Sequence, residues 1–241
     1  MEQEVKIELT KDGSHTLFVP SLNEHYHSVN GAKQESDHIF IKAGLLHSLK
    51  DDIKILEIGF GTGLNAYLSL CVTQHTNKRI DYTSLELYPL PMEIVGQLNY
   101  VESDKPEIKE YFIQLHACDW DIKNEITPHF YLTKIQTDFS KLDFSFLSDI
   151  TFDIVYFDAF APEKQPEMWS QEIFDTLYTL TSEDGILTTY CAKGVVRRML
   201  LQAGYNVERL PGPPGKREML RATKSKNQFL LSKTLIIESN L

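Results

Sequence analysis

The sequence predicts an α/β domain in which helices flank a mostly parallel β-sheet. Apolar runs typical of strands alternate along the chain with longer runs that have the apolar spacing of helices. The apolar run IKILEI (53–58) is followed at once by a glycine-rich turn and then by a helical run at 64–75. Such alternation requires crossover connections, and ligands are expected outside the carboxyl ends of the strands.

Six further strands are predicted after the first, which makes a seven-stranded sheet. They lie at 80–87, 130–138, 152–160, 185–192, 205–210 and 227–235. Further helices are predicted at 91–101, 168–180 and 192–204, the last of which ends at Gly204, a residue suited to a C-cap.

Two segments fall outside this alternation. Residues 1–45 precede it, and we expect them to form an N-terminal extension that closes over the site. Residues 46–241 are expected to form the main domain, which a mixed stretch at 102–130 interrupts as an insertion.

Length and composition exclude several classes of protein. The chain has 241 residues, of which 42% are hydrophobic and 24% charged, and this excludes fibrous and disordered proteins. No run approaches the roughly 18 apolar residues of a membrane span, and the charged start is unlike a signal peptide, so we expect a cytoplasmic protein. The three cysteines, Cys71, Cys118 and Cys191, form no CxxC motif, so we expect neither a disulfide framework nor a metal site.

Charge is unevenly distributed along the chain. The formal net charge is −10, yet the stretch from Cys191 to the end holds ten Lys and Arg against three Glu. A basic face at this end of the chain could contact a polyanion while the acidic remainder stays soluble.

The turn after the first strand carries three glycines in alternation, at Gly59, Gly61 and Gly63. Glycines at this spacing let the backbone approach a ligand closely, and the following helix presents free N–H groups. The spacing matches neither the dinucleotide motif G-x-G-x-x-G nor a P-loop, so a nucleoside without phosphate fits better.

With the acid that precedes the glycines, the segment resembles motif I of the class I S-adenosylmethionine-dependent methyltransferases. The resemblance implies a Rossmann-like, mostly parallel seven-stranded sheet with S-adenosyl-L-methionine as cofactor. It implies that Glu57, Gly59, Gly61, Thr62 and Gly63 bind this cofactor.

Two more carboxylates end predicted strands. Glu86 ends the next strand, where an acid can accept hydrogen bonds from both ribose hydroxyls. Asp138 ends the strand at 130–138, and in these methyltransferases an acid there holds the adenine amino group. Each alone also fits a solvated strand-end carboxylate, but together and in this order they favour cofactor binding.

A second motif follows the strand that begins at Phe152. It reads Asp158-Ala159-Phe160-Ala161-Pro162 and continues with Lys164, Pro166 and Met168-Trp169. This resembles the signature of the MnmC-type tRNA wobble-uridine methyltransferases, as do the stretches 57–65, 193–198 and 211–220.

This resemblance implies a specific reaction. A methyl group would pass from S-adenosylmethionine to the amine of 5-aminomethyl-(2-thio)uridine at the wobble position (34) of tRNA, giving 5-methylaminomethyl-(2-thio)uridine. Fused members of the family also carry an FAD-dependent oxidoreductase domain, which we expect to be absent, with a separate enzyme supplying the aminomethyl precursor. The alternatives are a small-amine methyltransferase or an aminopropyltransferase-like enzyme, which would not need the basic end of the chain, and a catalytically silent cofactor- or RNA-binding protein.

Asp158 is the candidate catalytic residue. Because the methyl group of the cofactor is already activated, the enzyme mainly has to align the reactants. Asp158 could bind the cationic amine, orient it and accept a proton. An anionic carboxylate also raises the pKa of an amine, so we expect orientation to be its first role. Capping the turn into Ala-Pro is the alternative, purely structural role.

The remaining candidates concern tRNA. Phe160 and Trp169 could stack on a splayed-out uracil, although Trp169 fits the core equally well. The stretch at 35–38 resembles a family segment and could close over the cofactor. The candidate phosphate contacts, which could also form a simple solvated face, are Lys164, Lys193, Arg197, Arg198, Lys216 and Arg217.

Overall fold

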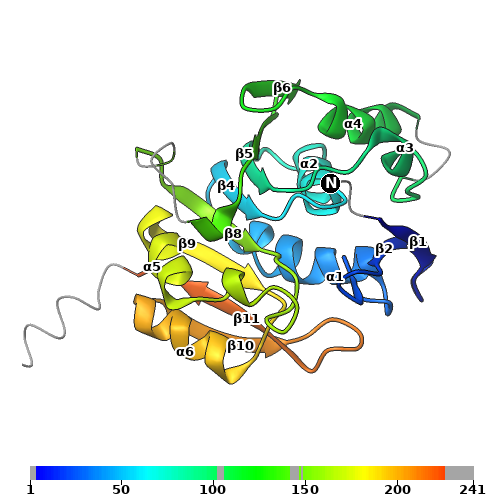
Figure 1. The fold of residues 1–241 in the computed structure, drawn as a ribbon. Helices are drawn as coiled ribbons and strands as arrows, with labels where there is room; N and C mark the ends of the chain where they lie inside the picture. The colour runs from blue at the N-terminus through cyan, green and yellow to red at the C-terminus, as the bar shows by residue number, and fades with distance from the viewer. Residues whose placement is uncertain (1–3, 102–105, 142–146, 148, 226–241) are drawn as a thin grey trace, which may run out of the picture.

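A single large sheet forms the centre of the molecule. The computed structural model describes residues 4–101, 106–141, 147 and 149–225 (Figure 1). Its eight-stranded sheet has the order β10-β11-β9-β8-β4-β5-β7-β6. The parallel strands are β4 (Asp52–Ile58), β5 (Arg79–Glu86), β7 (Phe130–Gln136), β8 (Phe152–Phe157) and β9 (Thr181–Thr189). The prediction of a mostly parallel sheet flanked by helices is confirmed.

Antiparallel strands complete both edges of the sheet. One edge is β6 (Lys123–Thr127), which comes from the predicted insertion and pairs with β7. The other edge is a hairpin of β10 (Asn206–Pro211) and β11 (Glu218–Thr223), in which β11 also pairs with β9. The sequence analysis did not predict β6 or β11, and the strand that it predicted at 227–235 lies outside the described residues.

Helices cover both faces of the sheet. The longer ones are α2 (Leu64–Thr73), α4 (Pro106–Ala117), α5 (Gln171–Leu180) and α6 (Gly194–Ala203). The start of α5 is fixed by Ser170, whose hydroxyl accepts a hydrogen bond from the N–H of Ile173. Among the described residues, no helix has the length and apolar character needed to cross a membrane.

One predicted helix is much shorter than expected. In place of a helix over 91–101, α3 is a single turn, Met92–Val95. Gly96 disfavours its continuation, and the side chain of Asn99 instead bonds to the backbone of an N-terminal turn. It accepts from the N–H of His15 and donates to the carbonyl of Gly13.

The two faces of the sheet bury separate apolar clusters. On β8, Ile154 and Tyr156 belong to the cluster under α2 and α4, whereas Val155 and Phe157 belong to the cluster under α5 and α6. All four side chains are fully buried. This alternation is what a strand covered on both faces requires.

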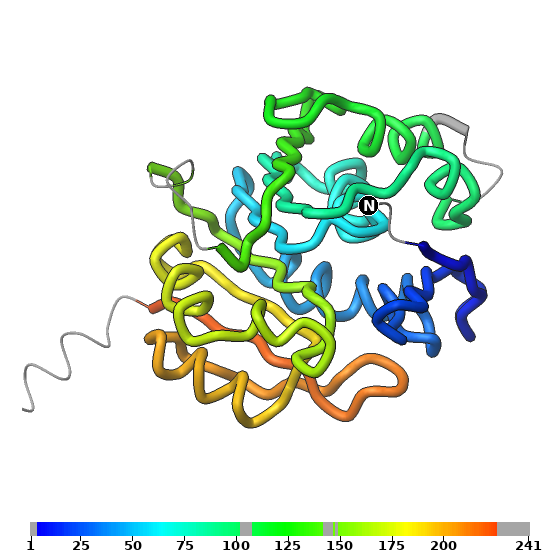
Figure 2. The backbone as a smooth tube through the Cα atoms, in the orientation of Figure 1, coloured from blue at the N-terminus to red at the C-terminus, as the bar shows by residue number. Residues whose placement is uncertain are grey.

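The N-terminal segment packs against one side of this domain. It contains a small sheet of β1 (Lys6–Leu9), β2 (His15–Val19) and β3 (Glu24–His25), followed by α1 (Ala32–Ser36) and one turn of π-helix, Asp37–Lys42. Figure 2 shows it beside the loop that joins β10 and β11, and His38 Nε2 donates to the carbonyl of Pro211 there, at 2.8 Å. Residues far apart in the sequence thus meet at this side of the sheet.

Ile154→Ala should lower the free energy of unfolding by about 2–5 kcal/mol, because it leaves a cavity in the middle of the central strand. Urea denaturation monitored by circular dichroism measures the change. Leu49→Ala is the matched control, since Leu49 is 98% exposed and its truncation should leave stability nearly unchanged. Equal effects of the two substitutions would contradict the described core.

Candidate active site

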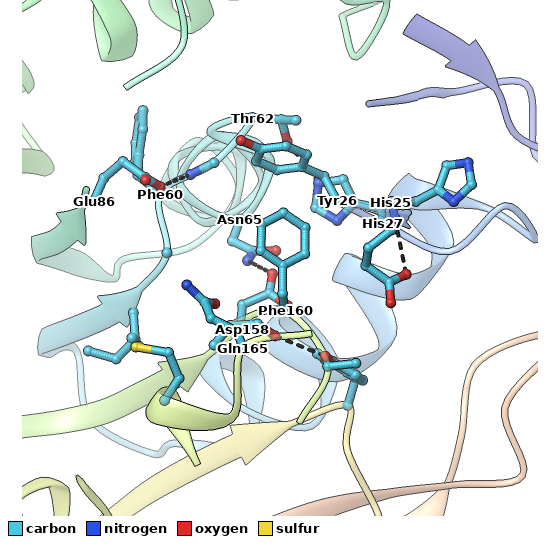
Figure 3. Close-up of a pocket in the computed structure, with 18 of the residues that line it drawn as sticks. His25, Tyr26, His27, Phe60, Thr62, Asn65, Glu86, Asp158, Phe160 and Gln165 are labelled. Carbon is cyan, nitrogen blue, oxygen red and sulfur yellow. Dashed lines mark hydrogen bonds between the residues drawn. The ribbon is translucent and has the colours of Figure 1, made fainter. Parts of the chain in front are cut away.

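A cavity of about 430 Å³ opens at the carboxyl ends of the parallel strands. The loop after β4, the ends of β5 and β8, and residues 24–29 of the N-terminal segment line it (Figure 3). This is the edge at which a parallel sheet binds ligands.

The glycine-rich loop after β4 forms one wall of this cavity. Gly59 and Gly61 line it and have φ of 94° and 50°, in the region that favours glycine. A Cβ at Gly61 would lie 3.0 Å from the ring of Tyr26. Gly63 (φ 70°) lies behind the loop, where a Cβ would approach His116 Nε2 to 2.5 Å. Side chains at these positions would displace the loop or its neighbours.

Two histidines, buried His27 and half-buried His116, hold Thr62, which also lines the cavity. The hydroxyl of Thr62 shares a 2.7 Å hydrogen bond with His27 Nε2, and its carbonyl accepts from His116 Nε2 at 3.1 Å. Burial lowers the pKa of both imidazoles to about 4, so both are neutral at pH 7. Sequence analysis missed both histidines, because a single His carries no spacing signal.

Glu86 and Asp138 line the cavity at neighbouring strand ends, in the predicted order. Glu86 Oε2 accepts from the N–H of Gly61 at 2.9 Å, and its Oε1 accepts from the N–H of Tyr88 at 2.8 Å. Asp138 accepts from the hydroxyl and the N–H of Ser140, and these bonds lower its pKa. Glu86 therefore also fixes the position of the glycine loop.

Glu57 does not line the cavity, in contrast to the expectation that it contacts the cofactor. Its side chain is fully buried behind the loop, where Ser84 Oγ donates to Oε2 at 2.6 Å. Burial raises the pKa of Glu57 to about 8, so the group is mainly neutral at pH 7.

Asp158 follows β8 directly and lines the cavity. Asn65 Nδ2 donates to Asp158 Oδ2 at 2.9 Å. Burial raises the pKa of Asp158 to about 7 although the bond from Asn65 opposes this shift. The carboxyl group therefore changes its charge near neutral pH. Sequence analysis did not single out Asn65, although it lies in the quoted motif at 57–65.

An aromatic pair stands above Asp158 in Figure 3. The rings of Phe160 and Tyr26 meet edge to face with centroids 5.1 Å apart, and both residues line the cavity. The interpretation of Trp169 as a stacking residue is wrong, because its side chain is buried against Phe157 and Phe174. Its indole N–H donates to the carbonyl of Phe160 at 2.8 Å, so it supports the loop that carries Phe160.

The predicted basic residues differ in their surroundings. Lys216 lines the cavity and pairs with Glu35 at 2.7 Å, and its predicted phosphate contact stays a prediction. Lys164 donates to the carbonyl of Leu22 in the N-terminal segment. The other four lie on or near the surface. Arg198, Arg217 and Lys193 are exposed, and Arg197 is half-buried. Lys193 forms an ion pair with Glu163.

The comparisons with known proteins decide the family. Residues 102–225 match the family model described as S-adenosyl-L-methionine-dependent methyltransferase. The chain belongs to this family. The chain is therefore a methyltransferase that uses S-adenosyl-L-methionine, and the glycine loop with Glu86 and Asp138 suits a nucleoside of this kind. Among the described residues, no cluster of His, Cys, Asp and Glu is suited to a metal ion.

Curated relatives and a solved structure extend this result. The chain is 29% identical over 243 residues to the tRNA 5-methylaminomethyl-2-thiouridine biosynthesis bifunctional protein MnmC of Leptospira interrogans, covering 93% of this chain and 36% of that protein. It is 30% identical over 233 residues to the protein of the same name from Pseudoalteromonas atlantica, covering 89% and 32%. The chain thus spans about a third of the length of these relatives. The crystal structure of MNMC2 from Aquifex aeolicus has the same fold, with a TM-score of 0.77 and 24% identity over 98% of this chain and 76% of that one.

Gly61→Ala should weaken binding of S-adenosyl-L-methionine by at least about tenfold, because the new methyl group meets Tyr26 and moves the loop. Isothermal titration calorimetry measures the affinity. Gly13→Ala is the matched control: Gly13 also has a positive φ, of 82°, but a Cβ there meets no atom within 4 Å. Equal affinity in the two variants would show that the loop tolerates a side chain at Gly61.

The stability of the folded protein should decrease less with rising pH in Glu57→Gln than in the parent. The folded state keeps Glu57 protonated up to about pH 8, whereas the unfolded chain releases this proton near pH 4.5, so folding becomes less favourable between these values. The amide of Gln stays neutral and keeps an acceptor for Ser84. Melting temperatures of the variant and the parent should therefore differ most above about pH 8.

Glu125→Gln is the control for this comparison, since Glu125 is an exposed carboxylate on β6. Its removal should leave the pH dependence of the melting temperature unchanged. Parallel curves for the parent and Glu57→Gln would mean that Glu57 is ionised in the folded protein.

Proposed function

We propose that this methyltransferase transfers the methyl group of S-adenosyl-L-methionine to the primary amine of 5-aminomethyl-(2-thio)uridine at the wobble position of tRNA. The observation that carries the proposal is the carboxyl group of Asp158, which lies in the cofactor cavity at the end of β8 and is oriented by Asn65. The name of the curated relatives, which align with nearly the whole of this chain, supports the same substrate.

Asp158 can both bind the ammonium form of an amine substrate and remove its proton. The cofactor supplies an activated methyl group, so the protein's residues have to bind, orient and deprotonate the amine. An ammonium has no free lone pair, and ionised Asp158 can bind it, orient it and take one proton. Since Asn65 holds Oδ2, we assign this proton to Oδ1. A pKa of about 7 makes Asp158 a stronger base than an ordinary carboxylate.

The acceptor base and the rest of the tRNA need other contacts. We propose that Phe160 and Tyr26 contact the uracil ring, since both line the cavity and unstacked bases bind to aromatic side chains. We assign phosphate contacts to Arg197, Arg198 and Arg217, and to Lys193 when it leaves Glu163. Phosphate contacts of this kind position an RNA without reading its sequence.

The remaining parts of the proposal concern the cofactor, the N-terminal segment and the cell. We assign the cofactor contacts to Gly59, Gly61, Thr62, Glu86 and Asp138, with Glu57 and Gly63 supporting the loop from behind. We also propose that residues 1–45 are an extension that closes the site, which residues 24–29 line. A separate enzyme in the cytoplasm would supply the aminomethyl precursor.

The proposal is tested by incubating the protein with labelled S-adenosyl-L-methionine and tRNA that lacks only this last methylation. Mass analysis of nucleosides should show 5-methylaminomethyl-(2-thio)uridine. Asp158→Asn should reduce turnover by at least about 10²-fold, because the amide can neither attract the ammonium nor accept its proton. Cofactor affinity should stay within a few fold of the parent's, and Asp175→Asn, an exposed acid on α5, should behave like the parent.

Full activity of Asp158→Asn would contradict the role of Asp158. If the parent binds cofactor but transfers no methyl group to this tRNA, the substrate assignment is wrong, and transfer to polyamines would then support a small-amine methyltransferase.

A further inference from the structure

The cavity contains a second buried carboxylate besides Asp158. Glu35 on α1 is 6% exposed and lines the cavity. Its Oε2 accepts from the N–H of Ser28 at 2.8 Å, and its Oε1 pairs with Lys216 Nζ at 2.7 Å. The pair joins the N-terminal segment to the loop between β10 and β11.

Lys216 lies close to the reacting end of the cavity. Its ammonium stands 3.8 Å from the ring centroid of Tyr190, a cation–π contact. The hydroxyl of Tyr190 donates to the carbonyl of Ala159, the residue after Asp158, at 2.9 Å. Glu35 and Lys216 therefore line the same cavity as Asp158 and influence its charge.

Lys216 is held in this position by its loop. His38 donates to the carbonyl of Pro211 at one end of the loop, and the N–H of Gly212 donates to the carbonyl of Arg217 across it. Gly215 (φ 87°) packs so closely against Asn30 that a Cβ would overlap with it. These contacts fix the loop and so hold the ammonium of Lys216 beside Glu35.

The cavity lining has more carboxylates than cations, so the pairing of Lys216 with Glu35 decides which carboxylate has a cation beside it. Among the described residues that line it, five are carboxylates and Lys216 is the one Lys or Arg. Glu86 and Asp138 already bind backbone N–H groups on the cofactor side, and Glu24 accepts from the N–H of His25. Without Lys216, Glu35 would be a buried carboxylate without a cation, and an ammonium in the cavity could replace the missing partner.

We propose that Lys216 is a specificity residue of the acceptor site: by occupying Glu35, it directs the amine of the substrate to Asp158. This inference rests on the proposed function, in which the amine binds at Asp158. An ammonium at Glu35 would be bound unproductively, because Glu35 belongs to α1 and not to the strand ends that carry the cofactor loop and Asp158.

The same pair affects the charge of Asp158. Among the described residues, the charged or titratable groups that interact electrostatically with Asp158 are Glu35, Lys216, Glu57, Tyr82 and Tyr190. Glu35 raises the pKa of Asp158 and Lys216 lowers it. Because Asp158 acts in its ionised form, methyl transfer should increase with pH as Asp158 loses its proton. Loss of Lys216 alone should shift this increase to higher pH.

The test compares Lys216→Met, Glu35→Gln and the double variant in the methyl-transfer assay. Lys216→Met should lower kcat and KM together, each by about tenfold or more, so that kcat/KM stays near the parent value, as competing unproductive binding requires. Adding Glu35→Gln should restore kcat to within a few fold of the parent and return the pH midpoint towards the parent value. If the Glu35–Lys216 pair only links the N-terminal segment to the loop between β10 and β11, all three variants lose that link and the double variant should be as inactive as Lys216→Met. That result would overturn the proposal.

Glu24→Gln provides the matched control, since it removes a different carboxylate from the same cavity. Combined with Lys216→Met, it should not restore kcat, and restoration would overturn the role of Glu35. Lys216→Arg keeps the charge and should retain most activity. If Lys216→Met does not fold, Lys216→Gln with and without Glu35→Gln gives the same comparison.

A binding measurement separates failure of this inference from failure of the proposed function. Carboxyl carbon NMR with added methylammonium chloride needs neither tRNA nor turnover. The Glu35 signal should respond to methylammonium in Lys216→Met and not in the parent, and no response in either protein would overturn the inference. Absence of methyl transfer by the parent, with the NMR response present, would instead contradict the proposed substrate.

Discussion

The absence of a side chain at Gly59 is the constraint on which the site depends. Its N–H donates to the carbonyl of Leu85 at the end of β5, and a Cβ there would stand 3.0 Å from the carbonyl oxygen of Asp158 after β8. Three parallel strands can therefore end within one small volume. The glycine loop, Glu86 and Asp158 are brought together by this close approach, and the cavity is the space that it leaves open.

Much of this arrangement follows from local sequence. Apolar strands, a glycine-rich turn and acids at strand ends are short-range patterns, so the parallel strands and the positions of Glu86, Asp138 and Asp158 could be predicted. The strand β6 was missed because an edge strand of mixed composition carries a weak periodic signal. The helix at 91–101 was overpredicted because the bonds of Asn99 to a distant turn were not visible in its own segment.

The errors at the site have a different cause. Phe160 and Trp169 lie in one motif, yet the first faces the cavity and the second lies in the core, a difference that only packing against Phe157 and Phe174 decides. Lys216 belongs to a basic stretch, but its partner Glu35 comes from the other end of the chain. Sequence patterns report which residue types are available, whereas the partner of a charge is set by tertiary contacts.

The hydrogen bond from His116 to the carbonyl of Thr62 gives the insertion a thermodynamic role. His116 belongs to the last turn of α4, outside the strands that form the cavity floor, and its ring also packs against Phe60, so α4 is in direct contact with the cofactor loop. A ligand that holds the loop in its native position stabilises every element that must be folded for that position to exist. Local opening of α4 and occupancy of the cavity are therefore coupled equilibria, and protection of α4 amides against hydrogen exchange becomes a measure of how full the cavity is.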